Sequence, residues 1–236
     1  MRVGGWTIGI LALAGSLALA ACGAEAPVEQ PAATVEAAAI APEVEVRGPE
    51  RTILAFGDSL FAGYNLAPHE GYPEQLEAAL RADGINARVI DAGVSGDTTA
   101  AGRQRIGFVL DSAAAKPDLA IVELGGNDLL RGIAPEETRA NLAAILDELA
   151  ARDIPVLLMG MRAPPNLGVQ FQAAFDGLYP ALAEEYDAAL VPFFLEAVYD
   201  QPQLILPDRV HPTAAGVAAL AEATLPAVTN ALPTSD

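Results

Sequence analysis

Three side chains in this sequence have the chemistry of a nucleophile and of the groups that activate it. Ser59 follows the apolar run Ile53–Phe56, within the segment Gly57-Asp58-Ser59-Leu60. Asp208 and His211 lie near the other end of the chain. A serine hydroxyl becomes a strong nucleophile when a histidine takes its proton, and a carboxylate can hold that histidine in the required tautomer. If folding brings these residues together, they predict nucleophilic catalysis at Ser59.

His211 is one of only two histidines in the chain, and the other is His69. It lies in the turn-prone segment Pro207–Pro212, three residues after Asp208. In such a turn Asp208 can accept a hydrogen bond from one ring nitrogen and leave the other nitrogen as a base. The alternative is that Asp208 caps the final helix and His211 is a solvated loop residue. His69, in a polar loop, is expected to be solvated.

Ser59 is predicted to lie at the carboxyl end of a buried strand. Gly57 permits the chain to turn sharply there. A helix is expected to begin at Ser59, which would leave its backbone N–H free to face an anion. The alternative is that Ser59 is only a helix N-cap, a position that serine favours. The preceding Asp58 is expected to make local hydrogen bonds in the turn.

The elements that must position these residues alternate along the chain. Short, nearly all-apolar runs are separated by longer stretches of helical character, which indicates a parallel sheet covered on both faces, a three-layer α/β/α domain. The expected strands are Ile53–Phe56, Ala87–Ile90, Leu119–Leu124, Val156–Met159 and Ala189–Val191. The expected helices are Tyr72–Asp83, Thr98–Ala115, Pro135–Arg152, Gln170–Tyr186 and Thr213–Val228.

Glycine-containing polar loops follow the first three expected strands. The second loop contains Gly96 and the third contains Asn127. Because the carboxyl ends of parallel strands meet at one edge of a sheet, we expect both loops to converge on Ser59. Glu123, inside the third apolar run, is expected to be a buried carboxylate with its hydrogen bonds satisfied.

Together and in this order, these segments resemble the four blocks of the SGNH hydrolase family, also called GDSL esterases. The matching residues are Ser59 in Gly-Asp-Ser-Leu, Gly96 in Ser-Gly-Asp-Thr, Asn127 in Gly-Gly-Asn-Asp, and Asp208 with His211 in Asp-x-x-His-Pro. The similarity covers residues 53–228 and is strongest to the bacterial thioesterase I/protease I/lysophospholipase branch, which includes arylesterases. Residues 122–128, 161–165 and 191–199 carry that match. Arg209 departs from the glycine often found at its position.

The resemblance implies a flavodoxin-like fold with a five-stranded parallel sheet. It also implies hydrolysis of carboxylic acyl esters, of the arylesterase, lysophospholipase or acyl thioesterase type, through an acyl-serine intermediate and without a cofactor or metal. Ser59 would attack the acyl carbon, His211 would act as base and then acid, and Asp208 would orient His211. The oxyanion hole would consist of the backbone N–H groups of Ser59 and Gly96 and the side-chain amide of Asn127.

Two other functions remain open at this point. One is a carbohydrate O-acetyl esterase, since many members of the resembled family have that activity. The other is a surface binding lipoprotein without catalysis, which the intact set of Ser59, Asn127, Asp208 and His211 argues against. The segment Met161–Tyr179 bears on the choice of substrate. Its aromatic residues could line an acyl groove, or, being four positions apart, they could form the core face of a helix.

The first residues of the chain have the pattern of an export signal. Arg2 precedes the uncharged apolar run Trp6–Ala21, which is shorter than the roughly 20 residues of a membrane-spanning helix. Cys22 is the only cysteine, and together with Leu19-Ala20-Ala21 it resembles the lipobox of bacterial lipoproteins. That resemblance implies a signal peptide over residues 1–21 and an acylated Cys22. The protein would then be lipid-anchored in a bacterial cell envelope, facing the periplasm, with the outer membrane as the default. The alternative is an ordinary signal peptide with a chance cysteine.

Residues 22–50 are predicted to be an acidic linker, and residues 51–232 the folded domain. Ala24–Glu50 contains six glutamates, four prolines and no aromatic residue, a composition that cannot bury a core. The whole chain carries 31 acidic and 13 basic residues, a net charge of −18. This balance argues against nucleic acid as a partner, because phosphate binding needs basic patches. The family resemblance implies a small-molecule acyl ester or lipid as the partner.

Overall fold

The computed structural model describes residues 46–234, and its helices and strands lie between Arg51 and Ala231. The predicted signal peptide, Cys22 and residues 22–45 of the predicted linker lie outside the described residues. The division of the chain into signal, linker and domain therefore stays a prediction. Within the described part, no helix is both long enough and apolar enough to cross a membrane.

A single parallel sheet forms the centre of the domain. Its strands are β1 (Arg51–Gly57), β2 (Ala87–Gly93), β3 (Leu119–Glu123), β4 (Val156–Met159) and β5 (Ala189–Val191). They are arranged in the order β2-β1-β3-β4-β5, with every neighbouring pair parallel. This is the flavodoxin-like order, in which the strand sequence reverses beside β1. The predicted fold class and its five strands are confirmed.

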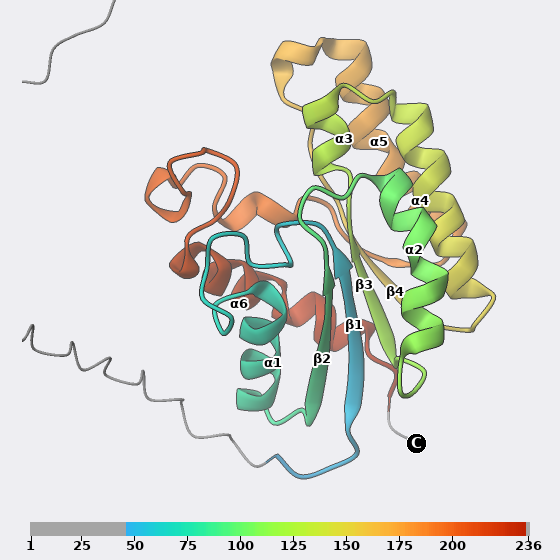
Figure 1. Cartoon of the computed structure of the whole chain (residues 1–236), viewed down its shortest axis with the longest axis vertical. Helices are drawn as coiled ribbons and strands as arrows, with labels where there is room; N and C mark the ends of the chain where they lie inside the picture. Colours follow the sequence, from blue (N-terminus) through green and yellow to red (C-terminus); the bar gives the residue numbers. More distant parts are fainter. Residues whose placement is uncertain (1–45, 235–236) are drawn as a thin grey trace, which may run out of the picture. The chain divides into compact units, whose positions relative to one another are not determined.

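Helices cover both faces of the sheet, as Figure 1 shows. One face carries α1 (Tyr72–Ala82) and α6 (Ala214–Ala231), and the other carries α2 (Thr99–Ser112), α4 (Pro135–Ala150) and α5 (Val169–Glu185). Short 3-10 helices follow β4 and β5, at Pro165–Leu167, Phe194–Ala197 and Pro202–Leu204. The three-layer arrangement follows from the apolar strands, which must be buried on both faces.

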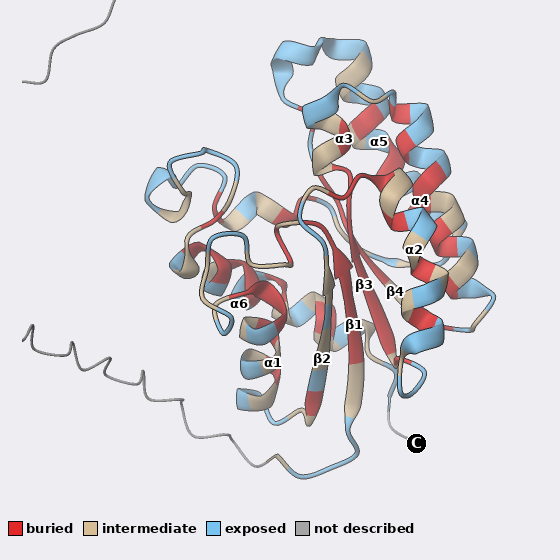
Figure 2. Cartoon of the chain, in the orientation of Figure 1, coloured by how far each residue is buried: buried red, intermediate tan, exposed pale blue. Residues whose placement is uncertain are grey.

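The core lies on both sides of β1 and β3. Ile53, Leu54, Ala55 and Phe56 are each no more than 1% exposed, although successive side chains point to opposite faces. Figure 2 shows this burial along β1, β3 and β4, while β2 at the edge is only partly covered. Burying each large apolar side chain contributes about 1.5–3 kcal/mol, so the central strands are firmly fixed in place. Functional loops at their carboxyl ends therefore start from rigid positions.

Two local features differ from the sequence prediction. The structure has a six-residue helix, α3 (Gly126–Arg131), between Gly125 and Gly132, both in the left-handed region with φ of 119° and 66°. A helix this short has too few turns to show an apolar period, so the pattern did not reveal it. The α-helix expected to begin at Ser59 is absent. Residues 58–66 instead form consecutive turns, in which Gly63 has φ of 63°, and α1 begins only at Tyr72.

Candidate active site

Folding brings the hydroxyl, imidazole and carboxylate groups of three predicted residues into line. The Oγ of Ser59 lies 2.8 Å from Nε2 of His211. The Nδ1 of His211 lies 2.8 Å from Oδ2 of Asp208. Asp208 also accepts hydrogen bonds from the backbone N–H groups of Val210 and His211, so it is fixed in the turn. A base in contact with a hydroxyl and held by a carboxylate is the geometry that nucleophilic catalysis needs.

Ser59 lies on a tight turn immediately after β1. The N–H of Ala62 donates to the carbonyl of Asp58 at 3.0 Å, which closes the turn. A β-carbon added at Gly57 would lie 2.8 Å from the Phe61 ring and 2.9 Å from the carbonyl of Glu123, so only glycine fits there. In the described part of the chain, no acceptor binds the backbone N–H of Ser59. The free amide that we predicted is present, although a turn supplies it and not a helix N-terminus.

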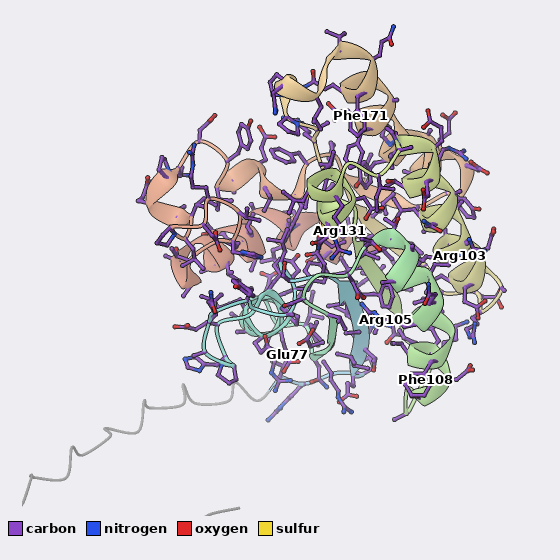
Figure 3. All side chains as sticks on the ribbon, turned by 45° about the horizontal axis from the view of Figure 1, so that its top comes forward. Glu77, Arg103, Arg105, Phe108, Arg131 and Phe171 are labelled. Carbon is purple, nitrogen blue, oxygen red and sulfur yellow. The ribbon has the colours of Figure 1, made fainter. Side chains whose placement is uncertain are left out.

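Gly96 lies in the loop after β2 and has φ of 86°. Space does not require a glycine here, because a β-carbon at Gly96 would meet nothing closer than the Arg131 guanidinium at 3.7 Å. The left-handed backbone conformation does, because residues with a β-carbon rarely adopt it. Arg131 donates to the carbonyl of Gly96 at 2.7 Å, which holds the loop (Figure 3 labels Arg131). Within residues 46–234 the backbone N–H of Gly96 has no acceptor.

Asn127 lies in the first turn of α3. Its side-chain Nδ2 donates to Oδ2 of Asp58 at 3.0 Å, which leaves the second amide hydrogen available for another acceptor. Ser59, Gly96 and Asn127 line one pocket, together with His211. Three residues with available N–H groups therefore line the pocket that contains the Ser59 hydroxyl, and donors of this kind can stabilise an oxyanion.

A buried carboxylate connects α3 to the first turns of α2 and α4. Asp128 is 0% exposed and accepts hydrogen bonds from the N–H of Thr99 at 2.8 Å and the hydroxyl of Thr99 at 2.5 Å. The hydroxyl of Thr138, in the first turn of α4, donates to the same group at 3.1 Å. Asp128 is therefore a structural residue that fixes the neighbouring Asn127.

Arg105 connects the Ser59 turn to the Gly96 loop. Its Nε donates to Oδ2 of Asp97 at 2.6 Å, and a terminal nitrogen donates to the carbonyl of Gly57 at 2.9 Å. The guanidinium carbon lies 4.0 Å from the centre of the Phe56 ring. As Figure 3 shows, Arg105 comes from α2 and points toward β1. It holds the two loops at a fixed separation.

The charge state of Asp208 suits its position next to His211. Partial burial disfavours ionisation, but hydrogen bonds from the backbone and the imidazole outweigh it and lower the pKa of Asp208 to about 2. The carboxylate is therefore ionised at any pH where a histidine base works. Tyr64 stacks on the His211 ring, with 4.3 Å between ring centres and 30° between planes. Tyr64 therefore covers one face of the imidazole ring.

A second carboxyl pair lies behind the Ser59 turn. Asp58 is 2% exposed, and its Oδ1 accepts from the N–H of Leu60 at 3.0 Å, so the predicted local hydrogen bond is present. Glu123 is 0% exposed, and its Oε2 accepts from the N–H of Asp58 at 3.3 Å. The predicted burial of Glu123 is correct, but its predicted satisfaction is not, because no described donor reaches Oε1. Burial raises the pKa of both groups.

The pocket over Ser59 has a volume of about 810 Å³ and is mostly apolar. The loop after β4 contributes Met161, Pro164 and Leu167, and the chain after β5 contributes Phe193 and Val198. An apolar wall next to a few polar groups is typical of a site that binds an organic ligand. Among the described residues, no group of three or more His, Cys, Asp or Glu side chains is placed to hold a metal ion.

The aromatic residues of the predicted Met161–Tyr179 segment belong to the core and not to the pocket. Phe175 and Tyr179 are at most 1% exposed, and Phe171 packs against Phe175. The helical interpretation of their spacing is therefore correct, and the residues that reach the pocket precede α5. His69, also predicted to be solvated, is exposed.

Comparison with known proteins decides the family. Residues 55–219 match the GDSL-like lipase/acylhydrolase family. The chain belongs to this family. Esterase TesA of Pseudomonas aeruginosa is 40% identical over 172 residues, which cover 73% of this chain and 85% of that protein. Thioesterase 1/protease 1/lysophospholipase L1 of Escherichia coli (strain K12) is 40% identical over 161 residues, covering 68% and 75% respectively. The crystal structure of AlinE4, an SGNH-hydrolase family esterase, is 69% identical with a TM-score of 0.68, covering 80% of this chain and 100% of that one.

The predicted resemblance is confirmed, and this GDSL-like acylhydrolase is a carboxylic ester hydrolase. Its structure also places residues around the site that sequence reasoning missed. Arg105, Arg131 and Tyr64 act through partners distant in sequence or through ring stacking, which no local pattern records. The sequence around Asp128 likewise gives no sign of its contacts with Thr99 and Thr138.

Proposed function

We propose that this hydrolase cleaves acyl esters through an acyl-serine intermediate on Ser59. The observation that carries the proposal is the 2.8 Å contact between Ser59 Oγ and His211 Nε2, with Asp208 on the opposite ring nitrogen. His211 takes the hydroxyl proton as Ser59 attacks the acyl carbon, and then gives that proton to the leaving alcohol or thiol. Water, activated by the same imidazole, then hydrolyses the acyl-serine. Neither step needs a cofactor.

The tetrahedral intermediates would be stabilised by the backbone N–H groups of Ser59 and Gly96 and by the Asn127 amide. All three are neutral donors held before substrate binds, so no reorganisation is needed as negative charge develops. The restraints come from Arg105, Arg131 and Asp58, each hydrogen-bonded to one of these loops or side chains. Fixed donors of this kind supply much of the rate enhancement in acyl transfer.

The substrate is proposed to carry an apolar acyl or aryl group. Five of the large apolar side chains that remain exposed in the described residues line this pocket: Tyr64, Leu130, Leu167, Tyr199 and Val210. Such a rim suits the esterase, thioesterase and lysophospholipase activities in the names of the relatives. A carbohydrate O-acetyl esterase would need polar groups for sugar hydroxyls, and this mostly apolar lining argues against it.

An ester series tests the substrate class. Rates on p-nitrophenyl esters from acetate to palmitate should rise beyond acetate before they fall. Leu130→Ser and Leu167→Ser should lower kcat/KM more for the longer esters than for acetate. Phe108→Ser is the matched control, because Phe108 is 75% exposed on α2, outside the pocket. Equal effects of all three variants on all esters would contradict an apolar acyl site.

We also propose that the protein is exported, acylated on Cys22 and held at the envelope, facing the periplasm. Support comes from the Leu19-Ala20-Ala21-Cys22 segment and from the acidic linker that would separate the domain from the membrane. Two or more acyl chains give stable anchoring. Cys22→Ser should move the protein from the membrane fraction to the soluble fraction, with unchanged activity on a water-soluble ester. Retention of this variant in membranes would contradict anchoring through Cys22.

A fluorophosphonate label separates the enzyme from a non-catalytic binding lipoprotein. Such labels react with activated serines, so the purified protein should be labelled on Ser59. The reaction should be lost in His211→Ala, which retains Ser59 but lacks its base. An unlabelled wild-type protein that binds lipid without turnover would favour the binding lipoprotein.

A further inference from the structure

The proposed mechanism leaves one deeply buried ionisable side chain without a role, that of Glu123 at the end of β3. It is 0% exposed, and its Oε2 accepts the backbone N–H of Asp58 at 3.3 Å. Its Oε1 is buried and has no donor among residues 46–234. An ionised carboxylate in this position would be strongly unfavourable, because half of its charge would be unpaired and away from water. A protonated carboxyl avoids the problem, since it can donate a hydrogen bond.

Asp58 is the neighbour that can accept this hydrogen bond. Burial raises the pKa of Asp58, but the interaction between the Asp58 and Glu123 side chains opposes that rise, whereas it adds to the raised pKa of Glu123. Asp58 Oδ1 accepts from Leu60 N–H, and Oδ2 accepts from Asn127 Nδ2, both at 3.0 Å. Asp58 thus receives three donors when Glu123 is protonated, as expected of the charged member of a pair.

We propose that Glu123 is a positioning residue of the oxyanion hole: as a neutral acid it donates to Asp58, and Asp58 thereby holds the Asn127 amide toward the developing oxyanion. This inference rests on the proposed role of Asn127. The chain of contacts runs from Glu123 at the end of β3, through Asp58 in the turn that contains Ser59, to Asn127 in α3. The proton on Glu123 therefore supports the connection between these three elements. Glu123 does not touch the substrate.

The other ionisable groups around Glu123 do not supply the hydrogen bond that the protonated Glu123 donates to Asp58. Tyr72 and Tyr179 both face Glu123, but the Tyr72 hydroxyl pairs with Thr224 at 2.7 Å and the Tyr179 hydroxyl donates to the carbonyl of Leu124 at 3.0 Å. Burial, followed by the charge of Asp58, raises the pKa of Glu123 well above its ordinary value, and no basic group offsets this within the described residues. His211 acts on Asp58 and favours its ionised form.

The proposal has a specific pH signature. The buried Oε1 without a donor favours the neutral acid, and burial raises the pKa of Glu123, so its proton leaves only as the pH rises through that raised pKa. Two adjacent buried anions then repel each other, and the support of the Asn127 amide is lost. We therefore expect kcat to fall on the alkaline side, with little change in KM, since an oxyanion donor acts mainly in the transition state.

Substitutions at Glu123 test this directly in the whole protein. Glu123→Gln keeps a donor toward Asp58 and an acceptor for its N–H but has no ionisable proton. Glu123→Leu removes the donor. Tyr72→Phe is the matched control, because it deletes an equally buried hydrogen bond that does not lead to Asn127. The measurements are kcat and KM on one water-soluble ester from about pH 6 to about pH 10.

We expect Glu123→Gln to keep kcat within a few-fold of wild type near neutral pH and to lose the alkaline limb. Glu123→Leu should lower kcat by at least about 10-fold, bounded by the roughly 10²–10³-fold effect of losing the donor itself. Tyr72→Phe should retain the wild-type profile. The proposal is overturned if wild type and Glu123→Gln have the same pH profile, or if Glu123→Leu keeps wild-type kcat.

A stability measurement covers the case in which Glu123→Leu does not fold. A raised folded-state pKa means that wild type loses stability, relative to Glu123→Gln, as the pH rises above the unfolded-state value. The melting temperature of wild type should therefore fall relative to that of Glu123→Gln as the pH rises. A difference that does not change with pH would overturn the proposal that Glu123 shares a proton with Asp58. Failure of the proposed function itself is distinguishable, because Ser59→Ala would then remain active whatever the Glu123 variants do.

Discussion

Arg131 donates a hydrogen bond of 2.7 Å to the carbonyl oxygen of Gly96, although Arg131 ends α3 and Gly96 lies in the loop after β2. Gly96 has φ of 86°. Glycine adopts this and other backbone conformations almost equally well, so the residue alone does not fix the arrangement of the loop. The arginine supplies the missing restraint from the end of α3. Asn127 lies on the same helix. The contact therefore fixes the position of the Gly96 backbone N–H relative to the Asn127 side-chain amide.

Arg131→Met should lower kcat by about 10-fold, less than the 10²–10³ expected for a deleted oxyanion donor, because the Gly96 amide is loosened and not removed. KM should change little. Arg103→Met is the control, since Arg103 is also an exposed arginine on a neighbouring helix, and it contacts Asn141. Similar effects of both substitutions would show that general charge, and not the Gly96 contact, matters.

Asn127→Ala should lower kcat by about 10²–10³, with a smaller change in KM, because the lost amide acts mainly in the transition state. Steady-state kinetics on a single soluble ester measure both constants. Asn86→Ala provides the comparison, since Asn86 lies before β2, at the opposite end of the sheet. An effect confined to KM would instead make Asn127 a substrate-binding residue.

The acid side of the activity profile should reflect His211 and not Asp208. Protonation of the imidazole removes the base, so kcat/KM should fall with decreasing pH and a slope of one proton. The pKa of Asp208 is lowered to about 2, so its contribution to stability is present above its unfolded-state value and is lost only as the pH falls toward 2. The melting temperature should therefore not fall over the pH range in which activity falls.

Asp208→Asn should lower kcat by about 10⁴-fold, because it disturbs the tautomer of His211. Activity that is flat from about pH 5 to about pH 8 would contradict a histidine base.

Arg209 lies between Asp208 and His211 with φ of 63°, a conformation that is costly for any residue with a β-carbon. Arg209→Gly should relieve this strain and raise the free energy of unfolding by up to about 1 kcal/mol. Arg88→Gly, in the extended conformation of β2, should lower it by about 0.5–1 kcal/mol. Denaturant unfolding of both variants makes the comparison. Destabilisation of equal size would show that the backbone of Arg209 is not strained.

The apolar strands made most of the fold predictable from sequence. All five expected strands formed, because runs such as Ile53–Phe56 are apolar at every position and must be covered on both faces. The helix expected at Ser59 was wrong. Local preference for a helix start was outweighed by Gly63 and Asn65 in left-handed conformations, which break the chain into turns.

The site was predictable to the extent that its residues follow strands. Strand ends place Ser59, Gly96 and Asn127 together. Residue type and spacing marked Asp208 and His211 as a possible carboxylate and base, and the resemblance assigned them to the same site. What could not be predicted are the contacts across long sequence separations. The contact between Asp58 and Glu123 joins positions 65 apart, and Arg105 reaches Gly57 over 48 positions. Such pairs depend on register and side-chain packing, which no single segment encodes.

The central claim is that Ser59 carries a transient acyl group, and mass spectrometry with kinetics tests it most directly. Wild-type protein, mixed with an ester and quenched in acid, should carry the acyl mass on the peptide that contains Ser59. Ser59→Ala should carry none, should remain folded, and should lose on the order of 10⁶ in kcat. An acyl adduct on another residue, or a Ser59→Ala variant that keeps more than about 1% of wild-type kcat, would contradict the account.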